Sequence, residues 1–128
     1  MRAGHPHPIV IEMKDNIIVD KSFNFSKKIV SLYRQLNERN EHIMSKQLMR
    51  SATSIGANVF EAQDAQSRND FVAKLNISLK EATETKYWLK LLYETNYISK
   101  DEFSILFDDC CEIHRILSSI ILSTKSDS

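Results

Sequence analysis

Apolar residues recur along most of the chain at spacings of three and four, which is the period of an amphipathic helix. The clearest case lies within residues 41–65, where successive apolar positions are 4, 4, 3, 4 and 3 residues apart. The pattern predicts a helix over this range. Its buried seam would consist of Met44, Leu48, Ala52, Ile55, Val59 and Ala62.

The middle of this helix is unusually rich in small side chains. Ser51, Ala52, Ser54, Gly56 and Ala57 fall within seven residues. A glycine inside a helix costs about 1 kcal/mol relative to alanine. Its benefit is that another backbone can approach closely. We therefore expect a neighbouring helix to pack tightly at Ala52 and Gly56.

Three more helices follow from the same kind of argument. The first should begin near Ser22 to Asn24, which are good caps, and end in the polar residues 37–40. The third, capped by Ser67, should reach residue 95, and the fourth should start at Ser99, with Glu102 as its reciprocal partner. The third helix has a seven-membered seam spaced 4-3-4-3-4-3: Phe71, Leu75, Ser78, Ala82, Thr85, Leu89 and Leu92.

Four amphipathic helices with short connections predict an all-α fold, an antiparallel up-down-up-down four-helix bundle over residues 22–122. Residues 1–21 are expected to form an extended arm, with a small hairpin pairing residues 9–11 and 17–19. Met13 resembles a second start, so residues 1–12 are interpreted as an upstream extension or a vector-derived scar. Residues 123–128 are expected to be a polar tail.

A second column of side chains, three of them apolar, runs along the third helix on the face roughly opposite its core seam. In a monomeric bundle this face would be exposed to solvent, so the apolar residues on it predict self-association. The alternative is that the tryptophan only covers the edge of the bundle. The candidate interface consists of Ile77, Glu81, Glu84, Trp88 and Leu91.

Charge is balanced overall, with 17 basic and 17 acidic residues among 128. It is unevenly distributed, because residues 13–40 carry six basic and three acidic groups, whereas residues 97–128 carry three and six. This pattern fits two solvated faces, complementary across a subunit contact, or else a basic strip for phosphates. If the protein binds RNA or DNA, the expected contacts are Lys27, Lys28, Arg34, Arg39, Lys46 and Arg50.

Candidate chemistry is sparse. No catalytic residues are predicted, and neither a cofactor nor a metal is expected, because no Glu-x-x-His motif and no glycine-rich phosphate loop occur. Cys110 lies on the core seam of the fourth helix and is expected to be an inert buried thiol. His114 is expected to be a core histidine. His5 and His7 alone are too few for a stable metal site.

The sequence resembles a known family in four segments: residues 46–58 (KQLMRSATSIGAN), Glu61 with Ala62, residues 70–75 and residues 78–92. The family is the bacterial four helix bundle proteins, first found in intervening sequences of 23S ribosomal RNA genes and called 23S rRNA-intervening sequence proteins. The likeness runs from Met13 to about Ile98. Phe60 departs from it, because a charged residue is common at this position.

The resemblance implies a small cytoplasmic bundle, with no membrane association, that assembles as a homopentameric ring and has no established activity. The accessory proteins of diversity-generating retroelements are similar in fold and bind nucleic acid through a strongly basic surface, whereas this chain is neutral. This chain departs from that pattern, so nucleic-acid binding does not follow from the resemblance alone. We expect a non-enzymatic oligomeric module of unestablished role, with nucleic acid as its candidate ligand. The alternatives are a scaffold for a protein partner, or small-ligand or metal binding at subunit junctions through Glu81 and Glu84.

Overall fold

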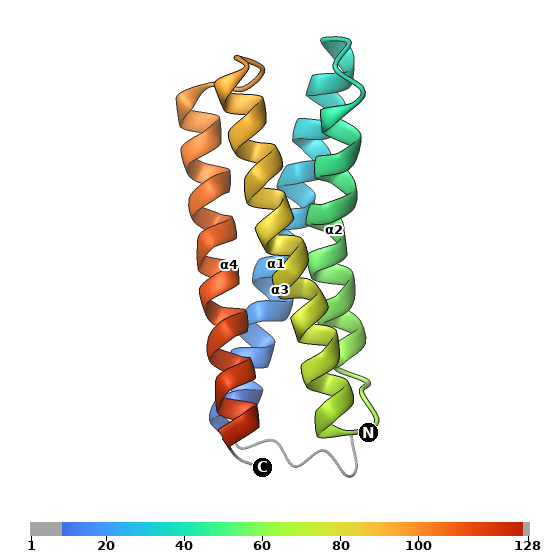
Figure 1. Cartoon of the computed structure of the whole chain (residues 1–128), viewed down its shortest axis with the longest axis vertical. Helices are drawn as coiled ribbons and strands as arrows, with labels where there is room; N and C mark the ends of the chain where they lie inside the picture. The colour runs from blue at the N-terminus through green and yellow to red at the C-terminus, as the bar shows by residue number, and fades with distance from the viewer. Residues whose placement is uncertain (1–8, 127–128) are drawn as a thin grey trace.

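Four long helices make up the structure, a computed structural model that describes residues 9–126, with side chains from residue 17 onward. The helices are α1 (Ile9–Glu38), α2 (Met44–Ala62), α3 (Arg68–Glu94) and α4 (Lys100–Ser126). Each helix runs antiparallel to the next, so α1 begins and α4 ends at the same end of the bundle (Figure 1). The predicted all-α, up-down-up-down four-helix bundle is confirmed.

The core follows the predicted seams. All seven seam positions of α3, including the polar Ser78 and Thr85, are buried. In α2, Leu48, Ala52 and Val59 are fully buried, as predicted. The helices pack in a closed cycle, because α1 contacts both α2 and α4, and α3 contacts both α2 and α4. Each helix therefore presents one face to the core and another to solvent.

The connections use the local signals that the sequence carries. Ser67 caps α3 by accepting the Asp70 N–H at 3.0 Å, as predicted. Ser99 and Glu102 form the predicted capping box, with distances of 3.0 Å and 3.1 Å. Asn96 has a φ of 69°, the left-handed conformation that commonly follows a helix.

The beginning of α1 differs from the prediction. The helix starts at Ile9 instead of near Ser22, so neither an extended arm over residues 9–21 nor a hairpin through residues 17–19 is formed. Ile18, Ser22 and Phe25 are buried and extend the seam of α1 backwards at spacings of four and three. Ser22 looked like a cap because it is small and polar, but it is a core position. The expectations for residues 1–8, including His5 and His7, lie outside the described residues.

The end of α4 also differs, because the helix continues to Ser126 where a polar tail was expected from residue 123. Thr124 is buried, and its hydroxyl donates to the Ile120 carbonyl at 2.8 Å. A threonine can satisfy its own hydroxyl in this way, so it is tolerated on a buried helical face. The helix α2 is shorter than predicted at both ends, since residues 41–65 were expected.

Candidate functional site

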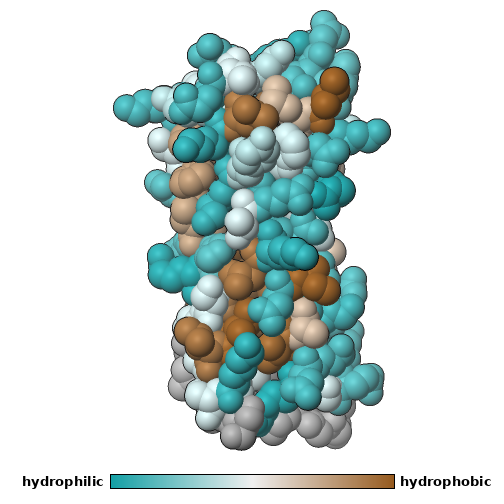
Figure 2. Space-filling view, in the orientation of Figure 1, coloured by the Kyte–Doolittle hydropathy of each residue, from teal (hydrophilic) through white to brown (hydrophobic). Residues whose placement is uncertain are grey.

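The outer face of α3 holds the five residues of the predicted interface. Ile77 is exposed over 43% of its surface, compared with 58% for Ile105 of α4. Glu81, Glu84, Trp88 and Leu91 are partly buried. In the view of Figure 2, apolar side chains gather at the surface of the lower half, on the side where α3 lies in front.

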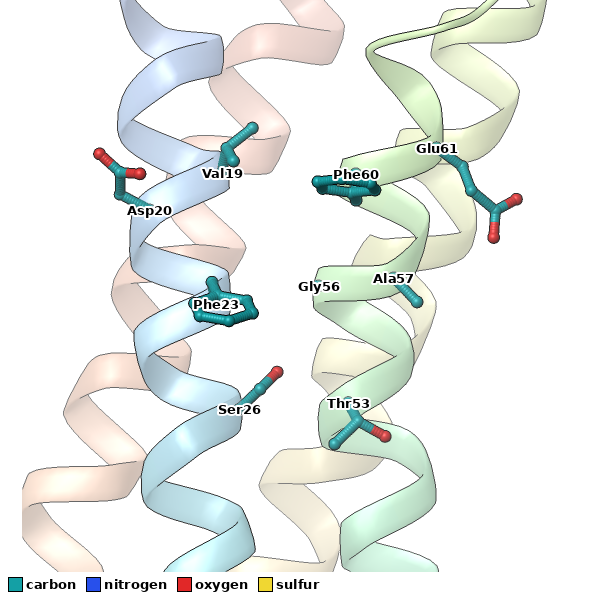
Figure 3. Close-up of a pocket in the computed structure, with 9 residues that line it drawn as sticks. All are labelled: Val19, Asp20, Phe23, Ser26, Thr53, Gly56, Ala57, Phe60 and Glu61. Carbon is teal, nitrogen blue, oxygen red and sulfur yellow. The ribbon is translucent and has the colours of Figure 1, made fainter.

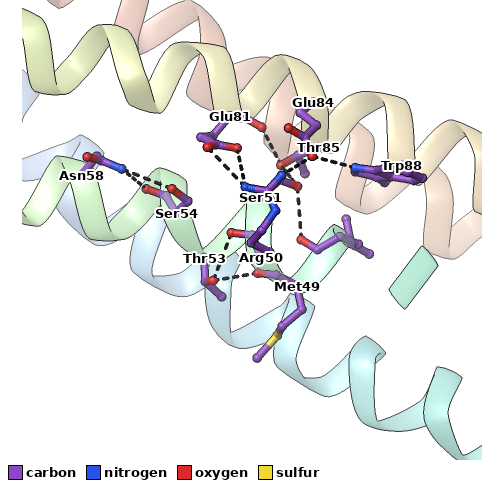
Figure 4. A network of polar contacts seen from close by, with 11 residues as sticks. Met49, Arg50, Ser51, Thr53, Ser54, Asn58, Glu81, Glu84, Thr85 and Trp88 are labelled. Atoms are coloured by element: carbon purple, nitrogen blue, oxygen red, sulfur yellow. Dashed lines mark hydrogen bonds and ion pairs between the residues drawn. The ribbon is translucent and has the colours of Figure 1, made fainter. Parts of the chain in front are cut away.

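Charged groups on this face are paired within the chain (Figure 4). Arg50 of α2 reaches across to Glu81 at 3.4 Å and also contacts the carboxylate of Glu84. The Trp88 indole N–H donates to the same Glu84 carboxylate at 2.9 Å. Hydrogen bonds from Trp88 and Arg50 hold the pKa of Glu84 below its usual range. The carboxylate is therefore ionised and satisfied at neutral pH.

Trp88 has features of both roles considered for it, a contact in a subunit interface and a cover over the edge of the bundle. Its side chain is half-buried and packs against the core. Its ring makes an edge-on contact with exposed Tyr87, with the ring centroids 5.0 Å apart. It therefore covers the edge of the bundle and still presents an aromatic surface to solvent.

Beneath this face, α2 and α3 share a buried polar seam. The Ser78 hydroxyl donates to the Ile55 carbonyl at 2.9 Å, and the Thr85 hydroxyl lies 2.9 Å from that of Ser51. Small side chains and internal hydrogen bonds let the two helices approach without leaving polar groups unsatisfied. The small residues predicted to favour close packing therefore serve two partners, since Gly56 faces α1.

An apolar groove of about 640 Å³ runs between α1 and α2. Phe23 and Phe60 project toward one another across it (Figure 3) and are exposed over 62% and 68% of their surfaces. A β-carbon on Gly56 would lie 3.2 Å from the Ser26 hydroxyl and 3.4 Å from the Ser22 carbonyl oxygen, so α1 is the helix that packs against α2 at Gly56. The sequence interpretation missed this groove. The available signal was two phenylalanines outside the core seams.

The six residues expected to contact nucleic acid do not form one surface. Lys28 is on the side of α1 that faces α4, where it pairs with Asp109 at 2.7 Å. Arg50 is on the opposite side, engaged with α3, and Arg39 donates to the Tyr97 carbonyl at 2.6 Å. Lys27, Arg34 and Lys46 are exposed, and the Lys27 ammonium lies 5.6 Å from the centre of the Phe23 ring.

The opposite net charges of residues 13–40 and 97–128 are explained in part by contacts within the bundle. Lys21 and Lys28 of α1 pair with Glu112 and Asp109 of α4. The basic first helix and the acidic fourth helix thus complement each other as neighbours. Such exposed pairs contribute little stability each, and they engage two of the six basic groups in residues 13–40.

The described cysteine and histidine side chains do not form a cluster that could act as a catalytic or metal site. Cys110 is buried in the core, as expected, and burial raises the pKa of its thiol to about 12. His114 is only half-buried, and burial lowers its pKa. Among the side chains described, those of residues 17–126, no three His, Cys, Asp or Glu residues are arranged to hold a metal ion. Glu81 and Glu84, the alternative ligand site, are already engaged by Arg50.

Comparison with known proteins agrees with this architecture. The model of the 23S rRNA-intervening sequence protein family matches residues 14–119. The chain belongs to the 23S rRNA-intervening sequence protein family. The match extends through most of α4, beyond the motifs recognised in the sequence.

A solved structure supports the same assignment for this 23S rRNA-intervening sequence protein. It is a 1.70 Å crystal structure of a protein of unknown function from the S23 ribosomal protein family of Bacteroides thetaiotaomicron. The two share 55% sequence identity with a TM-score of 0.83, covering 84% of this chain and 97% of the other. No curated protein matches the chain. Within residues 9–126, no helix combines the length and hydropathy needed to cross a bilayer.

Proposed function

We propose that this protein is a non-enzymatic, self-assembling helical module of the cytoplasm that works as a homopentameric ring. The observation that carries the proposal is the outer face of α3, where Ile77 is exposed among charges that are already paired within the chain. The number of subunits is what resemblance to the family implies.

The physical argument concerns the cost of burying this face. An exposed isoleucine gains free energy when a partner covers it, at roughly 25 cal/mol per Å². Burying an unpaired charge would cancel this gain, but Glu81 and Glu84 both form ion pairs with Arg50, so the three groups together carry one net negative charge instead of two. Tryptophan and arginine are also the residues most often found at the energetic centres of interfaces. Burying the outer face of α3 therefore costs less than burying the same carboxylates without Arg50.

Substitution of the interface tests this proposal. Trp88→Glu should dissociate the oligomer while leaving helix content largely intact, as measured by light scattering and circular dichroism. Ile77→Glu removes an exposed side chain, so it tests the same face with less effect on the core. Ile105→Glu on α4 is the matched control, since Ile105 is a similarly exposed isoleucine. If both α3 variants keep the size of the unmodified protein, the outer face of α3 is not an interface.

A second candidate function is nucleic-acid binding by the assembled ring. It is favoured by Lys27 and Arg34, which are seven residues apart on α1, exposed, and without an ion pair to any described residue. A ring would repeat this small basic site in every subunit and so multiply its affinity. Because the chain is neutral, a protein partner is the alternative to RNA or DNA.

A fluorescence titration against structured RNA and single-stranded DNA, at low and physiological salt, tests this candidate. Binding should weaken steeply with salt, and removing Lys27 and Arg34 together should reduce the salt slope by up to about two. Weak salt dependence, or no binding by a well-formed oligomer, would leave a scaffold for a protein partner.

A further inference from the structure

The apolar groove between α1 and α2 has the size of a small-molecule site. Its volume is about 640 Å³, and sites for small molecules typically measure roughly 300–1,000 Å³. Phe23 and Phe60 face each other across it, and each is more than half exposed (Figure 3). The core beneath them is already closed by buried residues such as Phe25 and Val59. The two rings are thus not needed for the packing of this chain, and the space between them is open to a ligand.

The floor of the groove offers apolar surface and one hydroxyl group. Gly56 and Ala57 contribute no polar side-chain atom to it. The Thr53 hydroxyl is already engaged, since it donates to the Met49 carbonyl at 2.7 Å. The Ser26 hydroxyl points into the groove in Figure 3 and makes no hydrogen bond to another described residue. A ligand would therefore be held mainly by apolar contact, with a single hydroxyl donor at the Ser26 end.

A cation lies at this same end of the groove. Lys27 directly follows Ser26, and its ammonium is 5.6 Å from the centre of the Phe23 ring. Lys27 is exposed and forms no ion pair with any residue whose side chain the structure describes. Arg34, seven residues further along α1, is exposed on the same side of the helix. An unpaired ammonium beside an apolar wall favours a ligand that joins an anionic group to an apolar body.

The carboxylates near the groove lie at its other end. Asp20 and Glu61 flank that end, and Figure 3 shows both pointing away from the space between the rings. Glu61 is paired with Lys74 of α3 at 3.0 Å. Asp20 precedes Lys27 by seven residues, which separates their backbones by about 10.5 Å along a helix. Charge therefore gives the groove a direction, with the positive end at Lys27.

We infer that the α1–α2 groove binds a small amphipathic anion, a free molecule with an aromatic or alkyl body and one carboxylate or sulfonate group. The body fills the space between Phe23 and Phe60, and the anionic group lies beside Lys27 and the Ser26 hydroxyl. An aromatic body also gains from stacking on the two rings, beyond the area that it buries. The inference does not depend on the proposed self-assembly, because every residue of the site belongs to one chain.

A fluorescence titration with anilinonaphthalene sulfonate tests the inference, because this probe joins an aromatic body to one anionic group and brightens when it leaves water. Phenyl-naphthylamine, the same rings without the sulfonate, is the neutral comparison. Phe60→Ala should weaken the binding of both probes by about tenfold, because one wall of the groove is lost. Lys27→Gln should weaken the anionic probe by up to about fivefold and leave the neutral probe unchanged. The matched controls are Tyr87→Ala and Lys80→Gln, at exposed positions of α3, which should leave both affinities unchanged.

Sedimentation velocity and circular dichroism on the same samples keep the outcomes distinct. If Phe60→Ala and Phe23→Ala bind both probes as tightly as the unmodified protein, the groove is not the site and the inference is overturned. If Lys27→Gln loses no affinity for the anionic probe relative to the neutral one, the site does not select an anion and the inference is wrong.

Absence of binding would also be decisive. If the unmodified protein binds neither probe, the inference is overturned, and a smaller particle size for Phe60→Ala would then show that a second copy of the chain covers the groove. Self-assembly through α3 is judged separately, by the variants of its outer face, so either proposal can fail without the other.

Discussion

Trp88 and Glu84 lie one turn apart on α3 and share a hydrogen bond of 2.9 Å, in which the indole N–H donates to the carboxylate. Arg50 from α2 contacts the same carboxylate. One acidic side chain thus ties the aromatic residue of the outer face to the neighbouring helix. Trp88 is the single tryptophan of the chain, so its fluorescence reports directly on this cluster.

Protonation of Glu84 should therefore be visible in the fluorescence. Trp88 and then Arg50 lower the pKa of this carboxyl from 4.5, so the cluster is intact above pH 4.5 and is lost as the pH falls through the lowered value. We expect a tryptophan emission change with a midpoint below pH 4.5 that is absent in Glu84→Gln. Glu94→Gln, an exposed carboxylate on the same helix, should keep the transition. A midpoint at or above 4.5, with helix content unchanged, would contradict this assignment.

A second carboxylate, that of Glu41, holds the beginning of α2. It is buried and accepts the backbone N–H groups of Ile43, Met44 and Ser45 at 3.1, 3.1 and 2.7 Å. Burial opposes its ionisation, but these backbone hydrogen bonds outweigh burial and lower its pKa. It thus replaces the usual Ser, Thr or Asp cap and satisfies three orphan donors of the helix.

Loss of this cap should be costly. Glu41→Ala should lower the free energy of unfolding by about 1–2 kcal/mol, measured by urea denaturation at pH 7. The loss should shrink as the pH falls from 4.5 through the lowered pKa of the folded state, since below that pKa the carboxylate is protonated in both states. Glu38→Ala, at an exposed position of α1, is the control. A change at pH 7 no larger than that of the control would show that the carboxylate does not hold the helix.

Features that depend on one helix or one turn could be predicted from the sequence. The seam of α3 was predicted in full because its seven positions repeat with one period, and a period depends only on the helix itself. The caps Ser67 and Ser99 were found because their partners lie three residues away. The function of Glu41 was not, since a glutamate at this position becomes a cap only when the turn before it folds back.

The missed features depend on pairs of helices. Ser22 is buried because Gly56 of α2 lets its backbone come close, and nothing in the sequence around Ser22 indicates this. The α1–α2 groove likewise exists only when Phe23 and Phe60 are brought to the same height of the bundle. The pairing of Lys28 with Asp109 shows the same limit, because charge segregation along the chain did not reveal which helices would be neighbours.

Gly56 offers a test of the close approach between α1 and α2. An alanine β-carbon would lie 3.2 Å from the Ser26 hydroxyl, which can rotate away, and 3.4 Å from the Ser22 carbonyl oxygen, an ordinary contact. Alanine also gains about 1 kcal/mol of helix propensity. Gly56→Ala should therefore change the free energy of unfolding by less than about 1 kcal/mol.

A larger side chain at this position should behave differently. Gly56→Leu should lower the free energy of unfolding by about 1–3 kcal/mol, because α1 must move away from α2. Ala73→Leu, at an exposed position of α3, should be nearly neutral under the same urea denaturation. If Gly56→Leu is as harmless as Ala73→Leu, the two helices are not in close contact at Gly56.

The adjacent thiols of α4 should differ sharply in reactivity. Cys110 is fully buried, with its Sγ 3.4 Å from the Ala82 carbonyl oxygen, whereas Cys111 is partly exposed. Burial, and then the neighbouring Cys111, raise the pKa of Cys110 to about 12. Since the thiolate is the reactive form, iodoacetamide at pH 8 should modify Cys111 alone in the native protein and both thiols in urea. Cys111→Ser should then take up no label until it unfolds. The same pKa gives a sign for stability: the folded state keeps a proton that the unfolded state loses, so stability should fall as the pH rises above 9.0 toward about 12. For the labelling experiment, modification of Cys110 in native Cys111→Ser at the rate of a free thiol would contradict the expected protection and would show that this part of the core opens readily.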